Sequence, residues 1–267
     1  MGSPSRFARL ADGDRVFHAR IEPDDAVREL PGAPWDTPGE PRSSRPMAGL
    51  RRLSPCTPSK IVAVGCNYRA HVAELNRELP AEPLLFMKPP SAILAPGGTI
   101  RLPAESRRVD YEGELAIVIG RRASRVSEDR ALEYVFGYTC LNDVTARDLQ
   151  RRDVQFTRAK GFDTFCPVGP CIVAGIDPSS LKVETYLNGE RRQSSPVNGM
   201  IFGIPRLISF ISGVMTLEPG DLIATGTPDG VGPLESGDEV RVSIAGIGEL
   251  TNRVEAMEEI PHEARAG

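Results

Sequence analysis

Three carboxylate side chains lie at the ends of apolar stretches where the sequence predicts strands. Glu112 and Glu114 adjoin the apolar run 115–119, and Asp143 directly follows the run 135–142. Side chains two apart on a strand share a face, so Glu112 and Glu114 would repel each other unless a cation lies between them. Carboxylates without a nearby Cys or His ligand suit a hard cation such as Mg²⁺, Mn²⁺ or Ca²⁺. The alternative is a solvated strand start beside a helix cap.

His71 and Glu74 form a second candidate site, because they lie three residues apart on a helix predicted over 67–79 and therefore share a face. A carboxylate beside an imidazole fixes its tautomer and raises its basicity, so the pair could activate a water molecule as a general base. The alternative is an ordinary ion pair on a helix surface.

Two further stretches carry weaker signals. Lys160, beside a glycine, could hold a substrate carboxylate or a developing oxyanion, although most lysines are simply exposed. The loop 224–232, A-T-G-T-P-D-G-V-G, could offer backbone N–H groups to an anion, or could be a plain hairpin turn. It is not a P-loop, because no Gly-Lys-Ser/Thr follows.

The chain that must position these residues has an ordinary globular composition. Its 267 residues are enough for one large domain with or without a small appendage, and its formal net charge is -4. It has no basic block of the kind that binds nucleic acid, and no apolar run approaches the roughly 20 residues of a membrane-spanning helix. The N-terminus lacks an apolar signal core and the five cysteines form no C-x-x-C pair, so we expect reduced thiols in the cytoplasm.

Predicted strands outnumber predicted helices. We expect two hairpins, one over 6–21 that turns at Asp12-Gly13 and one over 183–193 that turns at Asn188-Gly189, and a loop over 31–46. Further strands are expected over 60–64, 99–102, 113–119, 135–142, 168–174, 221–226, 239–244 and 249–254. One helix is expected to start at Ser127, a second to run over 144–152 with Asp143 as its cap, and a third to run over 204–211. Because most connections read as hairpins, the predicted fold class is α+β, built on a β-sandwich or roll and not on a doubly wound parallel sheet.

The chain resembles the fumarylacetoacetate hydrolase family in six motifs that occur in this order: G-x-N-Y-x-x-H-x-x-E, K-P-P-S-A, D-Y-E-G-E-L-A-x-V-I-G, N-D-V-T-A-R-D-L-Q, K-G-F-D-T-F-C-P and T-G-T-P-x-G-V-G. The resemblance covers about residues 58–255, and several motifs match over six or more consecutive positions. Residues 1–55 match only loosely. We therefore expect a small N-terminal domain over 1–55, a catalytic domain over 56–257 and a tail over 258–267.

The resemblance implies a mixed β-sandwich roll, usually a homodimer, with one divalent cation per active site. The residues it implies are Glu112, Glu114 and Asp143 as metal ligands, His71 and Glu74 as a lid dyad handling water or a proton, Lys160 facing the substrate, Thr227 and Gln150 contacting it, and Arg147 supporting the metal loop. It gives Asp110 no ligand role, and we expect that side chain to orient the loop. Asp229, in a variable position, would disfavour a second anionic group nearby.

The implied activity is that of an enzyme that uses Mg²⁺ or Mn²⁺ and acts on a small 2-oxo or 2-hydroxy-dienoic acid through a metal-stabilised enolate. The leading hypothesis is hydrolysis of a C–C bond in an acylpyruvate by water that His71 and Glu74 activate. The alternatives are isomerisation of 5-carboxymethyl-2-hydroxymuconate or 2-hydroxyhepta-2,4-diene-1,7-dioate, decarboxylation of a substrate such as oxaloacetate, and a metal-binding homologue without catalysis. No nucleic-acid or membrane partner is expected.

Overall fold

Three β-sheets carry most of the chain in the computed structural model, which describes residues 4–36, 44–74, 76 and 78–257. The largest sheet follows the order β4-β3-β2-β1-β14-β12-β11-β17-β6-β7, with β5 on β1 and β8 on β14. Its strands are β1 (Ser5–Asp12), β2 (Arg15–Ile21), β3 (Ala26–Glu29), β4 (Ser44–Pro46), β5 (Arg51–Arg52), β6 (Ile61–Gly65), β7 (Leu84–Lys88), β8 (Ile93–Leu94), β11 (Gly113–Ile119), β12 (Val135–Asn142), β14 (Cys166–Ala174) and β17 (Leu222–Ala224).

Two smaller sheets complete the β structure, in the orders β16-β15-β19-β20-β9 and β13-β10-β18. Their strands are β9 (Thr99–Leu102), β10 (Val109–Tyr111), β13 (Thr145–Ala146), β15 (Lys182–Leu187), β16 (Glu190–Pro196), β18 (Gly232–Pro233), β19 (Glu239–Ile244) and β20 (Gly248–Ala256). The largest hydrophobic cluster joins Ile117 of β11 to Val183 of β15 and Val242 of β19. Apolar side chains therefore fill the space between two facing sheets, as in a β-sandwich.

The sheets are mixed, because the pairs β14–β8, β17–β6 and β20–β9 are parallel while the other strand pairs in the described part of the chain are antiparallel. Together with few and short helices, this arrangement confirms the predicted α+β, β-rich class. Every residue of β11 is buried, as the apolar run 115–119 predicts for a central strand covered on both faces.

The helices are α1 (Arg69–Glu74), α2 (Arg147–Arg152), α3 (Thr157–Gly161) and α4 (Ile204–Val214), with short 3₁₀ turns η1 (Pro90–Ala92), η2 (Glu128–Tyr134), η3 (Pro178–Ser180) and η4 (Val197–Gly199). Four apolar side chains of α4 are buried, which stabilises the fold by about 6–12 kcal/mol at the usual value for an aliphatic side chain: Ile204, Leu207, Ile208 and Ile211. Among the described residues, no helix is long and apolar enough to cross a membrane.

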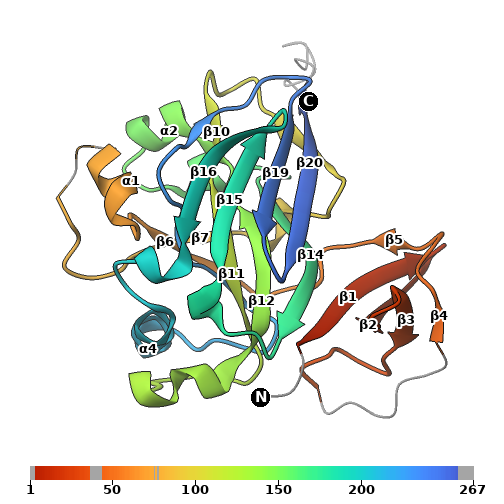
Figure 1. Ribbon diagram of the computed structural model, residues 1–267. Helices are drawn as coiled ribbons and strands as arrows, with labels where there is room; N and C mark the ends of the chain where they lie inside the picture. The colour runs from red at the N-terminus through yellow and green to blue at the C-terminus, as the bar shows by residue number, and fades with distance from the viewer. Residues whose placement is uncertain (1–3, 37–43, 75, 77, 258–267) are drawn as a thin grey trace, which may run out of the picture.

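Strands β1 to β5 form a lobe at the lower right of Figure 1, away from α1 and α2. This lobe is continuous with the main sheet, because β1 pairs antiparallel with β14 from Ser5↔Ala174 to Phe7↔Ile172. The division into an N-terminal domain over 1–55 and a catalytic domain over 56–257 stays a prediction. The predicted tail, 258–267, lies outside the described residues.

Some local predictions were wrong. The first hairpin turns at Gly13-Asp14 and not at Asp12-Gly13, because Asp12 still pairs with Arg15. The segment after Ser127 is the 3₁₀ turn η2, and Ser127 makes no side-chain cap bond.

Helix α1 is also shorter than the predicted helix over 67–79, since residues 76, 78 and 79 are not helical. It begins late because Asn67 is bonded elsewhere: its side-chain amide donates to Phe202 O at 3.1 Å and Thr225 O at 2.7 Å. These tertiary contacts hold Asn67 outside the helix and anchor the start of the segment that carries His71.

Candidate active site

Glu112 is the one residue between β10 and β11, where the chain passes from the three-stranded sheet into the largest sheet. The antiparallel register Gly113↔Asn142 places Asp143 directly opposite Glu112. Two hydrogen bonds fix this meeting point: Glu112 N–H donates to Asn142 Oδ1 at 2.9 Å, and Asp143 N–H donates to Glu112 O at 2.8 Å.

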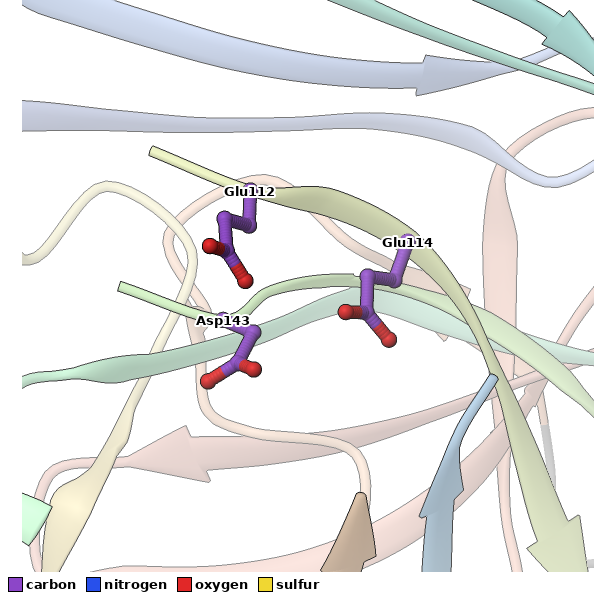
Figure 2. Close-up of side chains that lie close together, drawn as sticks. All are labelled: Glu112, Glu114 and Asp143. Carbon is purple, nitrogen blue, oxygen red and sulfur yellow. The ribbon is translucent and has the colours of Figure 1, made fainter. Parts of the chain in front are cut away.

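The three predicted carboxylates converge. Each of Glu112, Glu114 and Asp143 is buried and offers one oxygen within 4.8 Å of the others. Figure 2 shows their carboxylates turned toward a common space, with Glu112 just before β11, Glu114 on β11 and Asp143 just after β12. The solvated-strand alternative is therefore wrong. The helix-cap prediction is also wrong, because Thr145–Ala146 form β13 and α2 begins only at Arg147.

Gly113 keeps this stretch close to the facing sheet. A Cβ atom at Gly113 would lie 2.0 Å from Thr185 Oγ1 and 3.2 Å from Gln193 Oε1. Only glycine therefore allows β11 to pack here while Glu112 and Glu114 both point to the other face.

Buried cations surround the carboxylates. Lys160 Nζ donates to Glu112 Oε2 at 2.8 Å and to Asp143 Oδ2 at 2.6 Å, and Lys88 Nζ lies 2.7 Å from Asp143 Oδ1. Arg147 pairs with Glu112 and also donates from Nε to Asp110 Oδ2 at 2.9 Å. Lys88 and Lys160 are 0% and 2% exposed, so these charges are compensated by one another and not by water.

The electrostatics separate the two glutamates. Burial alone would raise the pKa of Glu112, but Lys160 and Arg147 outweigh it and hold that pKa well below its usual value. Burial, Asp143 and Glu112 together raise the pKa of Glu114 well above its usual value. Burial would lower the pKa of Lys160, but Asp143 and Glu112 reverse the effect and raise it. Of these two glutamates, Glu114 is therefore the one whose ionised form the surrounding cations stabilise less.

The donor set fits a hard divalent cation. It consists of three buried carboxylates within reach of one ion, with no thiolate or imidazole among them. A cation in this space would relieve the repulsion that raises the pKa of Glu114.

Asp110 is not part of the cluster. It accepts hydrogen bonds from Arg108 Nε at 2.9 Å and from Arg147 Nε at 2.9 Å. Arg147 in turn donates from Nη1 to Gln150 Oε1 at 2.6 Å. Asp110 therefore orients the arginine that pairs with Glu112, as expected of a residue that organises the loop.

His71 and Glu74 meet at the end of α1. His71 Nδ1 lies 3.0 Å from Glu74 Oε2, and His71 is only 4% exposed. The alternative of a surface ion pair is therefore wrong for the imidazole, although the Glu74 side chain is 35% exposed.

The glycine-rich loop after β17 binds its neighbours with backbone and hydroxyl groups. Gly226 N–H donates to Glu114 Oε2 at 2.7 Å, and Thr227 Oγ1 donates to Gly113 O at 2.9 Å. Gly230 N–H donates to Glu74 Oε1 at 3.1 Å. The loop does offer N–H groups to anions, and the two anions bound here are side chains of the protein.

These side chains line one cavity of about 80 Å³. The cavity brings together seven of the eight predicted site residues, namely His71, Glu112, Glu114, Asp143, Gln150, Lys160 and Thr227. Glu74, the eighth, lies behind His71. Asp229 is exposed and is not among the residues that line the cavity.

Sequence reasoning missed several residues of this site. Lys88 is buried against Asp143, whereas its motif K-P-P-S-A supports the family resemblance and indicates no role for the lysine. Arg151, Phe86 and Phe156 also line the cavity. Phe86 packs 4.8 Å from Lys160 Nζ, measured to the ring centroid, and 5.7 Å from Phe156. The only signal for Lys88 was its place at the end of an apolar strand.

The chain is similar to known protein families along most of its length. The family model "Fumarylacetoacetate (FAA) hydrolase C-terminal" matches residues 60–255, and an "Rv2993c-like, N-terminal" model matches residues 5–55. The oxaloacetate tautomerase YisK of Bacillus subtilis is 43% identical over 92% of this chain and 84% of its own.

Two solved structures are also similar. One, described as a 5-carboxymethyl-2-hydroxymuconate delta-isomerase from Mycobacterium smegmatis, is 48% identical, with a TM-score of 0.89 over 94% of this chain and 100% of its own. The other, a fumarylpyruvate hydrolase from Pseudomonas aeruginosa in complex with Mn²⁺ and pyruvate, is 32% identical, with a TM-score of 0.72 over 78% of this chain and 92% of its own. This chain belongs to the fumarylacetoacetate hydrolase family.

Proposed function

We propose that this protein is a divalent-metal-dependent enzyme that moves a proton between carbon and oxygen of a small 2-oxo dicarboxylic acid, with keto–enol tautomerisation of oxaloacetate as the specific reaction. One observation carries the proposal: His71 and Lys160 open onto the same small cavity as the carboxylates of Glu112, Glu114 and Asp143. Glu112, Glu114 and Asp143 would hold the cation, which would supply Lewis-acid polarisation of the substrate.

The protein's own residues handle the proton and the charge. Glu74 contacts His71 at Nδ1, which leaves Nε2 as the nitrogen that exchanges a proton with C3 of the substrate. The Lys160 ammonium stabilises negative charge that develops on the substrate oxygen, and the nearby Phe86 ring keeps water from this side. The proton removed from C3 is returned to the C2 oxygen, so no other reactant is needed.

A basic side chain at the rim of the cavity supports the proposal that the substrate has a second carboxylate. Arg147 already pairs with Asp110 and Glu112, whereas Arg151 is exposed and lines the cavity from the same helix. A guanidinium at that place matches the far carboxylate of a dicarboxylic acid. Thr227 and Gln150 are the proposed contacts for the carboxylate next to the 2-oxo group.

The test is an absorbance assay of enol oxaloacetate decay, with and without Mg²⁺ or Mn²⁺, for the protein and for its His71→Ala variant. The proposal expects metal-dependent acceleration that His71→Ala removes. Acceleration by the variant equal to that by the unchanged protein would contradict the assignment of the imidazole. Sedimentation of the same samples tests the predicted homodimer.

Hydrolysis of an acylpyruvate C–C bond is the second candidate. It is favoured by the same His71–Glu74 contact, which could orient a water molecule instead of taking a substrate proton. Product analysis by NMR separates the two: hydrolysis releases pyruvate and a second acid, while tautomerisation changes no carbon–carbon bond. Loss of CO₂ from oxaloacetate would indicate decarboxylation.

A further inference from the structure

Three polar contacts connect Tyr111, on β10, to the imidazole of His71. Tyr111 Oη donates to Gly230 O at 3.0 Å, and Gly230 N–H donates to Glu74 Oε1 at 3.1 Å. The other oxygen of Glu74, Oε2, lies 3.0 Å from His71 Nδ1. The backbone of Gly230 thus accepts a hydrogen bond from Tyr111 through its carbonyl oxygen. Through its N–H group it donates a hydrogen bond to Glu74, on the helix that carries His71.

The Gly230 peptide has little freedom to move. Gly230 has a φ of +90°, and a Cβ atom there would lie 2.1 Å from Arg192 O. Two residues later the loop enters β18, where Gly232 pairs with Tyr111. The backbone is therefore packed against β16 on one side and tied to β10 on the other.

Tyr111 itself is fixed by the core. It is 2% exposed and belongs to a buried apolar cluster with Val109 and Val144. It also directly precedes Glu112, so one short piece of chain sets both the carboxylate cluster and the tip of the loop.

We propose that Tyr111 is a positioning residue, which acts through Gly230 and Glu74 to hold the His71 imidazole in the cavity. The proposal rests on the proposed function for its kinetic consequence, because it assumes that His71 moves the proton. Its structural content, the order of α1, stands independently of the reaction.

The kinetic test uses Tyr111→Phe, which removes only the hydroxyl, and Tyr138→Phe as a matched control for a buried tyrosine in the main hydrophobic core. Loss of one neutral hydrogen bond should lower kcat about 3- to 10-fold in Tyr111→Phe, with KM changed less than about twofold. The same substitution is then made in a Glu74→Ala background. If Tyr111 acts through Glu74, it has no further effect there. An equal loss in both backgrounds would show that Tyr111 acts by another route.

The second measurement needs no activity. Amide hydrogen exchange of the metal-loaded protein should rise in peptides covering 69–74 and 226–232 in Tyr111→Phe, and in neither segment in Tyr138→Phe. Unchanged exchange of 69–74 in Tyr111→Phe would overturn the proposal even if the protein proved to have no tautomerase activity. Conversely, raised exchange without any turnover on oxaloacetate would support the positioning role and reject the proposed function.

Discussion

Replacement of Lys88 by methionine tests how the carboxylate cluster is compensated. Lys88 is fully buried, its Nζ lies 2.7 Å from Asp143 Oδ1, and it also donates to Val144 O at 3.2 Å. Methionine keeps much of the side-chain volume but removes the charge, so that Lys160 remains as the cationic partner of Asp143 within the described part of the chain. Removal of one partner of a buried ion pair costs about 3–5 kcal/mol.

That cost corresponds to a fall in the melting temperature of roughly 6–20 °C for a domain of this size. The matched control is Lys182→Met, because Lys182 is 48% exposed and pairs with Glu184 on the surface at 3.2 Å. An exposed pair of this kind contributes less than about 1 kcal/mol, so the control should melt within a few degrees of the unchanged protein.

The assay is thermal unfolding in chelator and in a saturating concentration of Mn²⁺. Without Lys88 the three carboxylates carry more uncompensated charge, so Mn²⁺ should raise the melting temperature more in Lys88→Met than in the unchanged protein. If Lys88→Met melts with the Lys182→Met control in chelator, the argument that Lys88 compensates Asp143 is refuted.

Three further predictions concern the site itself. Glu114→Gln should abolish the stabilisation by Mn²⁺ and the metal-dependent activity. Because the folded-state pKa of Glu114 is raised, its carboxylate destabilises the metal-free protein as pH rises above the usual value of 4.5, so the variant should be more stable than the unchanged protein at pH 8 and not at pH 4; melting scans in chelator at both pH values check this. His71→Ala should lower kcat by about 100-fold or more and change Mn²⁺ affinity by less than threefold, as measured by calorimetry; a parallel loss of both would mean that the imidazole supports the metal site. Arg151→Ala should raise KM for oxaloacetate about tenfold and leave KM for a monocarboxylic oxo acid unchanged. An equal rise for both substrates would contradict the proposed contact between Arg151 and the far carboxylate.

The parts of the site that follow local periodicity could be predicted from the sequence. Glu112 and Glu114 share a face because strand residues alternate, and the apolar positions of α4 follow the helical repeat. The hairpin turn at Asn188-Gly189 was also predicted correctly, since both residues adopt positive φ values of 52° and 81°.

What could not be predicted depends on contacts between distant segments. Lys88 meets the backbone at Val144 across 56 positions, and Tyr111 meets Gly230 across 119. The late start of the helix predicted from Asn67 has the same origin, because the bonds from its side-chain amide to distant backbone carbonyls outweigh its local helix preference. No spacing rule in one sequence records such pairs.

Lys160 occupies a bridging position between Glu112 and Asp143, where its ammonium already serves both carboxylates. The chain thus carries its own counter-ion for these two carboxylates. In the proposed enzyme, binding of the metal is therefore an exchange of cations. The divalent ion competes for the carboxylates with the ammonium of Lys160, which is covalently attached to the chain and therefore always near them. Such competition lowers the apparent affinity without altering the ligands, and it favours a cofactor that is drawn reversibly from the surrounding pool over one that is trapped during folding.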